Sequence, residues 1–189
     1  MILDIMMNYL EKLALQLIAS VKGVSKVIAE LRKFGKDVDK MIDQETRSAA
    51  EGVVLTAKNL APRDNGKLYQ NISHYSEKPL QRTIAVNVPY AAYLEFGTGT
   101  KVSVPAEFQE IANEFKNVTN KGSFEKGLEA IEIWCSRKGI PKENAKWIFL
   151  NILKVGINPQ PFLYPAWIKG KKDYLKNLEK LLSRMNKKI

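Results

Sequence analysis

The sequence predicts an α+β fold in which a long N-terminal helix packs on a small antiparallel β-sheet, with a helical insertion and a C-terminal helix after it. Three observations predict this class. Apolar residues recur every three or four positions through residues 1–60, two short strand-like segments follow at 68–88, and the helical period returns from residue 105. A chain of 189 residues, 45% of them hydrophobic and 26% charged, can bury one core.

We therefore expect one domain with four consecutive parts. Residues 1–60 form N-terminal helices and residues 61–104 form the sheet of the same domain. Residues 105–157 form the helical insertion, and residues 158–189 form an extended segment and the C-terminal helix.

The first part has two apolar series separated by Gly23, which we expect to break the helix. The series are Leu3, Met6, Leu10, Leu13, Leu17 and Val21, then Val24, Val27, Ile28, Leu31, Val38, Met41, Ile42, Ala49, Val53 and Leu60. The second series is either one long amphipathic helix or a broken pair. It packs on its own domain or pairs with a neighbouring subunit.

The sheet follows a turn at 62–66, where the sequence PRDNG is dense in turn formers. Segments 68–76 and 81–88 are expected to be strands joined by a hairpin loop at 77–80. Ile72, Ile84, Val86 and Val88 are the inward-facing candidates. Residues 101–104 are expected to add a short strand that Pro105 ends.

Helices are expected over 105–117, 124–139 and 141–156, and again from Pro165 to Met185. Pro141 falls just inside a predicted helix start, and Gly139 and Gly156 fall just past helix ends, where a left-handed residue is favoured. The last predicted helix has an apolar face: Trp167, Ile168, Tyr174, Leu175, Leu178, Leu181, Leu182 and Met185. Segment 157–165 contains three prolines and is expected to be extended.

Composition argues against an enzyme, a metal site and a membrane protein. Cys135 is the single cysteine and His74 the single histidine, so an internal disulfide, a four-cysteine metal site and a two-histidine site are excluded. Cys135 is expected to pack in a helix, and His74 lies mid-strand with no acid near it in sequence. We expect no cofactor. The single cysteine indicates an intracellular protein, or part of a particle assembled inside a cell. No apolar run approaches the ~18 residues of a membrane span, and the N-terminus lacks signal-peptide features.

The segment VPYAAYLEFGTG at 88–99 offers two interpretations. Glu95 could be a catalytic base beside a phosphate-binding loop at 97–99. However, a phosphate loop precedes its helix, whereas here the packing residues come first and the glycines follow. Gly97 is therefore expected to cap a short helix. Glu95 is then expected to pair with a backbone N–H or with a basic residue of an adjacent subunit.

The net charge of +10 indicates a polyanionic neighbour without choosing among nucleic acid, membrane surface and acidic protein. The basic residues gather at the C-terminus: Lys169, Lys171, Lys172, Lys176, Lys180, Arg184, Lys187 and Lys188. They form either a solvated helix face or a surface near DNA phosphates. Lys169, Lys171 and Lys172 are the DNA-facing candidates, and no base-reading motif accompanies them.

Three blocks together resemble the tail-completion and neck proteins, or head–tail connector minor tail proteins, of tailed bacteriophages. APRDNGKL at 61–68 resembles the family's A-P-x-D-T-G-x-L signature, with Asn65 at the threonine. The 88–99 segment resembles its Y-A-x-x-x-E-x-G-T block, and PQPFLYPAW at 159–167 its P-F-x-x-P-A block. The resemblance covers residues 45–182. The motif residues are Pro62, Asp64, Gly66, Leu68, Tyr90, Ala91, Leu94, Glu95, Phe96, Gly97, Thr98, Pro161, Phe162, Pro165 and Ala166.

The resemblance implies a structural virion protein that forms a ring, a hexamer or dodecamer, at the head–tail junction around the DNA channel. Its implied partners are copies of itself, head-closure or adaptor proteins, tail-terminator or tail-tube proteins, and DNA held without sequence specificity. Assembly is expected in the host cytoplasm, with no membrane. In the residue roles that we infer, Asp64 accepts backbone N–H groups, and Phe162 and Tyr164 are interface anchors. The alternative is a basic, non-sequence-specific nucleic-acid-binding accessory protein.

Overall fold

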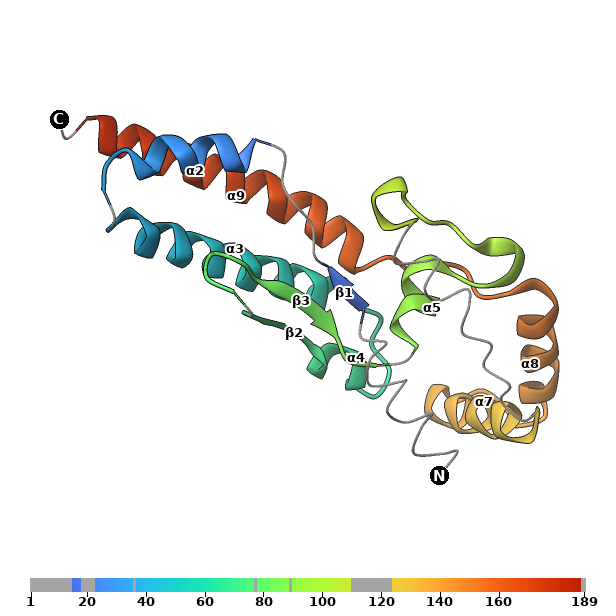
Figure 1. The fold of residues 1–189 in the computed structure, drawn as a ribbon. Coiled ribbons are helices and arrows are strands. Elements are labelled where there is room, and N and C mark those ends of the chain that lie inside the picture. Colours follow the sequence, from blue (N-terminus) through green and yellow to red (C-terminus); the bar gives the residue numbers. More distant parts are fainter. Residues whose placement is uncertain are drawn as a thin grey trace, which may run out of the picture. The chain divides into compact units, whose positions relative to one another are not determined.

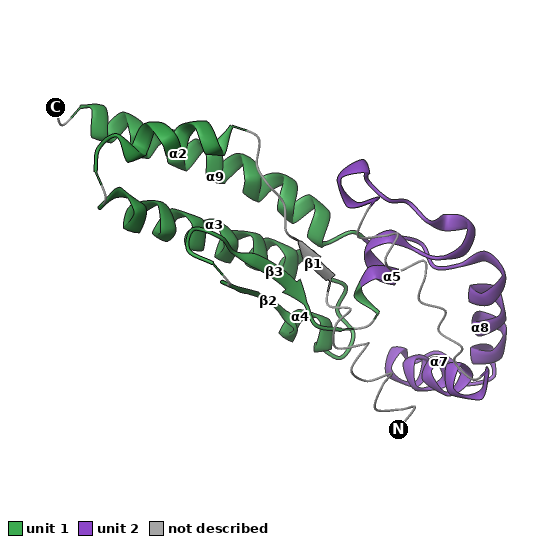
Figure 2. Cartoon of the chain, viewed as in Figure 1, with its two compact units in different colours: residues 1–91, 161–189 green, residues 92–160 purple. Residues whose placement is uncertain are grey.

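The computed structural model describes residues 23–35, 37–76, 78–88, 90–109 and 124–187, together with the backbone of residues 15–17. The chain divides into two compact units (Figure 2). Unit 1 comprises residues 1–91 and 161–189, and unit 2 comprises residues 92–160.

The sheet of unit 1 is antiparallel, in the order β1-β3-β2. Strand β2 (Ile72–Tyr75) and strand β3 (Thr83–Val86) form the predicted hairpin, with Tyr75 opposite Thr83. Strand β1 (Leu15–Leu17) pairs with the other edge of β3, with Leu15 opposite Val86. The helix expected over residues 3–21 is therefore wrong at 15–17, where β3 offers unpaired backbone groups. Residues 1–14 and 18–22 lie outside the described residues.

The second apolar series forms a broken pair of helices, α2 (Val24–Arg32) and α3 (Val38–Leu60). Gly35, at φ 106°, lies in the connection between them. A short helix, α4 (Lys67–Gln70), precedes β2, and α9 (Leu163–Asn186) completes unit 1. In Figure 1, α3 runs alongside α9, with α2 beside α9 and the sheet beside α3. The predicted packing of the long helix on a small sheet is confirmed.

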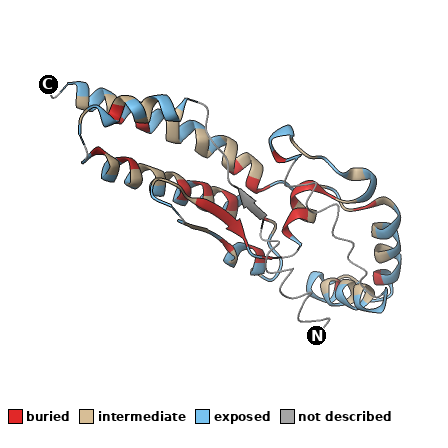
Figure 3. Ribbon diagram, in the orientation of Figure 1, coloured by how far each residue is buried: buried red, intermediate tan, exposed pale blue. Residues whose placement is uncertain are grey.

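The core of unit 1 is built by residues that the apolar periodicity selects (Figure 3). A buried cluster joins the three helices through Leu31, Val38, Ile42, Leu178 and Leu181. The four inward candidates of the hairpin, Ile72, Ile84, Val86 and Val88, are all buried. Met41 and Leu60, which we counted in the apolar series of α3, are exposed instead.

Unit 2 contains the whole of the predicted insertion, residues 105–157. Helix α5 (Ala91–Phe96) leads into it from unit 1, followed by two short 3-10 helices, η1 (Gly99–Lys101) and η2 (Ala106–Phe108). Helices α7 (Phe124–Lys138) and α8 (Asn144–Val155) pack on each other. Cys135 is buried in α7, as expected for a packing cysteine.

Several predicted boundaries need correction. Residues 101–104 form no strand, because Ser103 N–H donates to Phe96 O (2.8 Å) in a loop. The segment at 68–76 begins with α4 rather than a strand. Helix α8 begins at Asn144, so Pro141 lies in the preceding turn. Of the helix expected over 105–117, residues 106–108 form η2 and residues 110–117 lie outside the described part.

Candidate functional site

The first motif block forms the turn between α3 and the sheet. Gly66, at φ 78°, adopts the left-handed conformation that starts α4. The Lys67 backbone N–H donates to Asn65 Oδ1 (3.1 Å), so the residue at the family's threonine position stabilises this turn. Leu68 is buried, whereas Asp64 is exposed. The block therefore fixes the path of the chain from the long helix into the hairpin.

The second block is mostly core. Ala91, Ala92 and Phe96 are buried, and Phe96 meets Phe108 edge to face, with ring centroids 5.9 Å apart. The Glu95 side chain is only 2% exposed. Such burial leaves no surface on which a neighbouring subunit could reach it, so the pairing with an adjacent subunit is not supported.

The end of this block is bonded to a distant part of unit 2. Thr98 N–H donates to Ile157 O (3.0 Å), and Ile157 N–H donates back to Thr98 Oγ1 (2.8 Å). Gln160 N–H donates to Leu94 O (2.7 Å), and Thr100 Oγ1 donates to Val155 O (2.9 Å). We call these contacts, which join residues 94–100 to residues 155–160, the backbone clamp.

Gly97 ends α5, as predicted, and the clamp explains why no side chain fits there. Its φ is 75°, and its N–H donates to Tyr93 O (3.0 Å). A Cβ on Gly97 would lie 2.8 Å from Ile157 O and 2.9 Å from Lys101 O. The glycine therefore permits close approach of two backbone segments, which is a structural task and requires no anion.

The third block lies where unit 1 resumes. Phe162 is 0% exposed, and Leu163 and Ala166 are also buried. Helix α9 begins at Leu163, so Tyr164 and Pro165 belong to its first turn and not to an extended segment. Proline is tolerated there because the first N–H groups of a helix have no partner within it. Phe162 is a core residue, and the interpretation as a surface anchor is wrong.

Unit 1 contains an apolar cavity of about 420 Å³ beside α3 and α9. Its lining includes Val53, Leu80, Ile84 and Trp167. A hydrogen bond of 2.8 Å joins Thr46 Oγ1 to the Tyr174 hydroxyl at this place. Burial raises the pKa of Tyr174, the Thr46 hydrogen bond opposes this, and Asp43 and Glu45 add to it. Tyr174 is therefore a neutral phenol that bonds α9 to α3.

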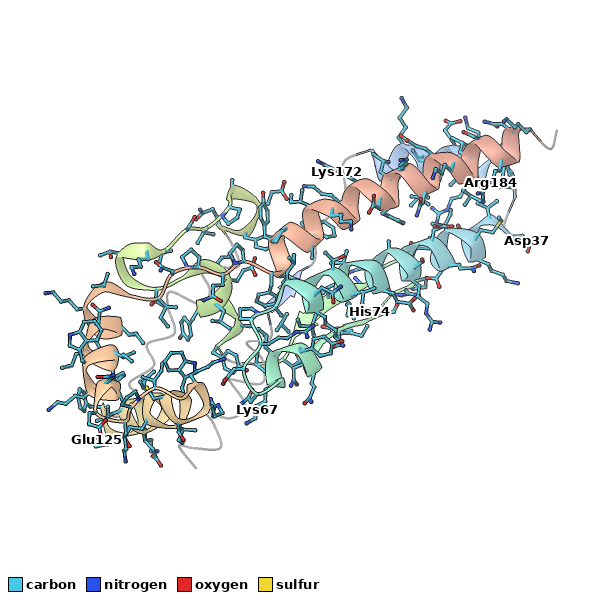
Figure 4. The ribbon with its side chains drawn as sticks, turned by 180° about the vertical axis from the view of Figure 1, so that it is seen from behind. Asp37, Lys67, His74, Glu125, Lys172 and Arg184 are labelled. Atoms are coloured by element: carbon cyan, nitrogen blue, oxygen red, sulfur yellow. The ribbon has the colours of Figure 1, made fainter. Side chains whose placement is uncertain are left out.

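His74 lies in strand β2 of the hairpin and is labelled in Figure 4. Burial lowers the pKa of its imidazole; Glu51 opposes this, and Arg82 and Arg47 reinforce it. Its Nδ1 is buried without a hydrogen-bond partner. The uncharged imidazole is therefore favoured in the folded chain.

The three DNA-facing candidates do not share one environment. Lys169 and Lys172 are exposed on α9, whereas Lys171 is only partly exposed and lines the cavity. Figure 4 labels Lys172 and Arg184 on the same helix. The exposed cations continue toward the C-terminal end of α9, and the DNA-facing role of all three lysines stays a prediction.

Neither a membrane-spanning helix nor a metal-binding group is found among the residues that the structure describes. None of its helices is both long and apolar enough to cross a membrane. His, Cys, Asp and Glu side chains do not gather in threes in the described ranges.

Residues 25–97 match the family described as "Bacteriophage HK97-gp10, putative tail-component". This stretch of the chain is similar to that phage tail-component family. The match begins at α2, earlier than the resemblance suggested, and ends at Gly97. Neither a curated protein nor a solved structure matches the chain.

Two of the three motif blocks fall within the HK97-gp10-like match, up to Gly97. The third block and α7 to α9 lie beyond it. The backbone clamp thus joins the end of the family region to residues outside it. Sequence analysis missed this pairing, because Thr98 and Ile157 are 59 positions apart and share no sequence pattern.

Proposed function

We propose that the chain is a structural ring component at the head–tail junction of a tailed phage, where it joins the tail to the head and surrounds the DNA channel. The observation that carries the proposal is the match of residues 25–97 to a phage tail-component family. Motif residues support it where they have structural tasks: Asn65 in the turn before α4, Phe96 and Phe162 in the core, and Gly97 at a close backbone approach.

An exposed apolar face on α8 supports assembly with other protein molecules. Trp147 is 71% exposed, Leu153 60% and Leu150 46%. These residues recur every three positions, so they follow one side of the helix. Large exposed apolar patches are typical of protein interfaces. We assign this face, rather than Phe162, to contacts within the ring or with its neighbours.

The variant Trp147→Asp tests this assignment. Because Trp147 is exposed, the chain should fold normally, while its assembly into a ring should weaken by more than tenfold in concentration. Leu55→Asp is the matched control, since Leu55 is 59% exposed on α3 and lies outside this face. Light scattering coupled to size exclusion gives the mass. Equal oligomer mass for both variants would remove α8 from the interface.

Further partners follow from the proposed position. The ring, a hexamer or dodecamer, contacts a head-closure or adaptor protein on one side and a tail-terminator or tail-tube protein on the other. It is assembled in the host cytoplasm and remains in the virion. Mixing the purified chain with each neighbour and measuring co-elution tests these contacts directly.

The basic surface of α9 favours one alternative, a nucleic-acid-binding accessory protein that acts alone. Such a protein binds DNA as a monomer or dimer at physiological salt. A ring component binds its neighbours instead and shows little DNA affinity as a free chain under those conditions. Titration of labelled DNA at 150 mM salt, on the order of physiological ionic strength, separates the two.

A further inference from the structure

The exposed side of α9 has a row of cations, and the exposed Asp173 lies within the same arc of the helix. The members of the row recur every three or four positions: Lys169, Lys172, Lys176, Lys180, Arg184 and Lys187. At 3.6 residues per turn they fall within an arc of about 120°. All six are exposed, and we call this row the basic stripe.

The stripe cannot turn toward the core, because the opposite side of α9 is occupied. Leu178 and Leu181 are buried in the cluster with α2 and α3. Tyr174 bonds to Thr46 of α3, and Gly170 lies against Val53. The orientation of the stripe is therefore fixed by the packing of its own helix.

The charge of the stripe is not neutralised within the described chain. Other cations of unit 1 have partners: Arg32 with Asp39, Arg47 with Glu51 and Arg82 with Asp43. The six stripe residues have no ion pair with a described residue.

The like charges of the basic stripe also repel one another. Asp173 and Glu179 are the acidic residues of α9 from 169 to 187, so this span, with the partly exposed Lys171, retains +7 − 2 = +5. Lys172, Lys176, Lys180 and Arg184 succeed one another at intervals of four. Like charges at that interval destabilise a helix, so the row points to an external anion.

We propose that the basic stripe contacts the phosphate backbone of double-stranded DNA without sequence specificity. This proposal rests on the proposed function, in which DNA passes through the ring, and it identifies the surface of the chain that faces the DNA. The stripe spans about 27 Å along the helix, the length of about 8 base pairs. Lysine ammonium groups act as point charges on phosphate and do not read bases in fixed geometry.

A membrane surface fits the stripe less well. A helix that lies in a membrane interface needs a free apolar side next to its cations. The apolar side of α9 packs in unit 1, and the exposed large hydrophobic residues of the described chain include none from α9. An acidic protein is the remaining competitor, and the experiment below distinguishes it.

The test measures binding of two unrelated 30-base-pair duplexes by fluorescence anisotropy between 50 and 150 mM salt. If all six cations contact phosphate, the logarithm of the association constant falls with the logarithm of the salt concentration, with a slope of about −5. The affinity for DNA then falls about 200-fold over this range. The variant Lys176→Gln/Lys180→Gln should bind both duplexes more weakly and reduce the slope by about 2. Lys40→Gln/Lys67→Gln removes the same charge from exposed positions of α3 and α4, outside both the stripe and the α8 face, and should leave binding unchanged.

Equal binding by the two double variants would overturn the proposal, as would absence of wild-type binding at 50 mM salt. Preferential binding to polyglutamate over DNA would overturn it in favour of an acidic protein. A separate result would contradict the proposed function alone. If the stripe variant loses DNA binding but the protein is absent from the virion neck, DNA contact by the stripe is supported and the ring role is contradicted. Circular dichroism of each variant checks that α9 remains folded.

Discussion

Gly170 of α9 lies directly against Val53 of α3, and a Cβ on Gly170 would collide with Val53 Cγ2. The absence of a side chain at position 170 allows the two long helices of unit 1 to approach each other. The contact lies beside the cavity that the same two residues help to line. The family region and the C-terminal helix are thus packed together at this point.

The variant Gly170→Ala should destabilise unit 1 by about 1–3 kcal/mol, because one added methyl group overfills a close helix contact. Chemical unfolding followed by circular dichroism measures the loss. Gly52→Ala in α3 is the matched control, since nothing lies within 4 Å of a Cβ there. The control should gain up to about 1 kcal/mol from helix propensity. Equal changes for both variants would refute close packing at 170.

Gly97→Ala should destabilise unit 2 more than Gly139→Ala does. Both glycines have positive φ, 75° and 67°, so the backbone cost is similar for each, on the order of 1 kcal/mol. Only Gly97 also faces the carbonyl oxygens of Ile157 and Lys101, whereas Gly139 has open space. Unfolding free energies of the two variants measure the difference. A difference near zero would show that the backbone clamp can move aside.

The free energy of unfolding should fall as the pH is lowered, because His74 titrates. The pKa of His74 is lowered in the folded chain, so the unfolded chain, with a pKa of about 6.5, takes up the proton first as pH falls. The stabilisation is therefore complete above about pH 6.5 and is lost below it. Unfolding free energies at pH 7.5 and pH 5.5 measure this loss, because the two pH values lie on either side of the unfolded-chain pKa of about 6.5. His74→Gln should lack this part of the dependence, and an identical profile would exclude His74 as its source.

Asp43 joins α3 to the hairpin loop in two ways. Its Oδ2 accepts from Arg82 Nη2 (2.9 Å), and its Oδ1 accepts from Leu80 N–H (3.3 Å). Asp43→Asn keeps an acceptor for Leu80 and should cost less than about 1 kcal/mol, because the carboxylate is partly exposed. Asp43→Ala removes both bonds and should cost about 1–2 kcal/mol. Equal losses in urea unfolding would mean that the Leu80 bond contributes nothing.

Local patterns predicted much of this fold. The hairpin, the inward residues of its strands, the capping role of Gly97 and the apolar side of α9 each depend on neighbours in sequence. Helix periodicity also selected the three helices that form the core of unit 1. Such features could be read from residues within one or two turns of each other.

Pairings between distant residues could not be predicted. The strand at Leu15–Leu17 has the same apolar residues that a helix would have, and it is specified by the free edge of β3. The clamp at Thr98 depends on carbonyl and amide groups near Ile157, which every residue type possesses. Phe162 looked like a surface anchor because aromatic residues serve interfaces and cores alike, and only packing decides between them.

Reconstruction of the virion neck by cryo-electron microscopy, in the phage that encodes the chain, tests the proposed role most directly. We expect density for unit 1 in a closed ring between head and tail, with the basic stripe of α9 directed toward the axial DNA. Density for the chain in the tail tube or at the tail tip, or a mature particle that lacks the chain, would contradict it.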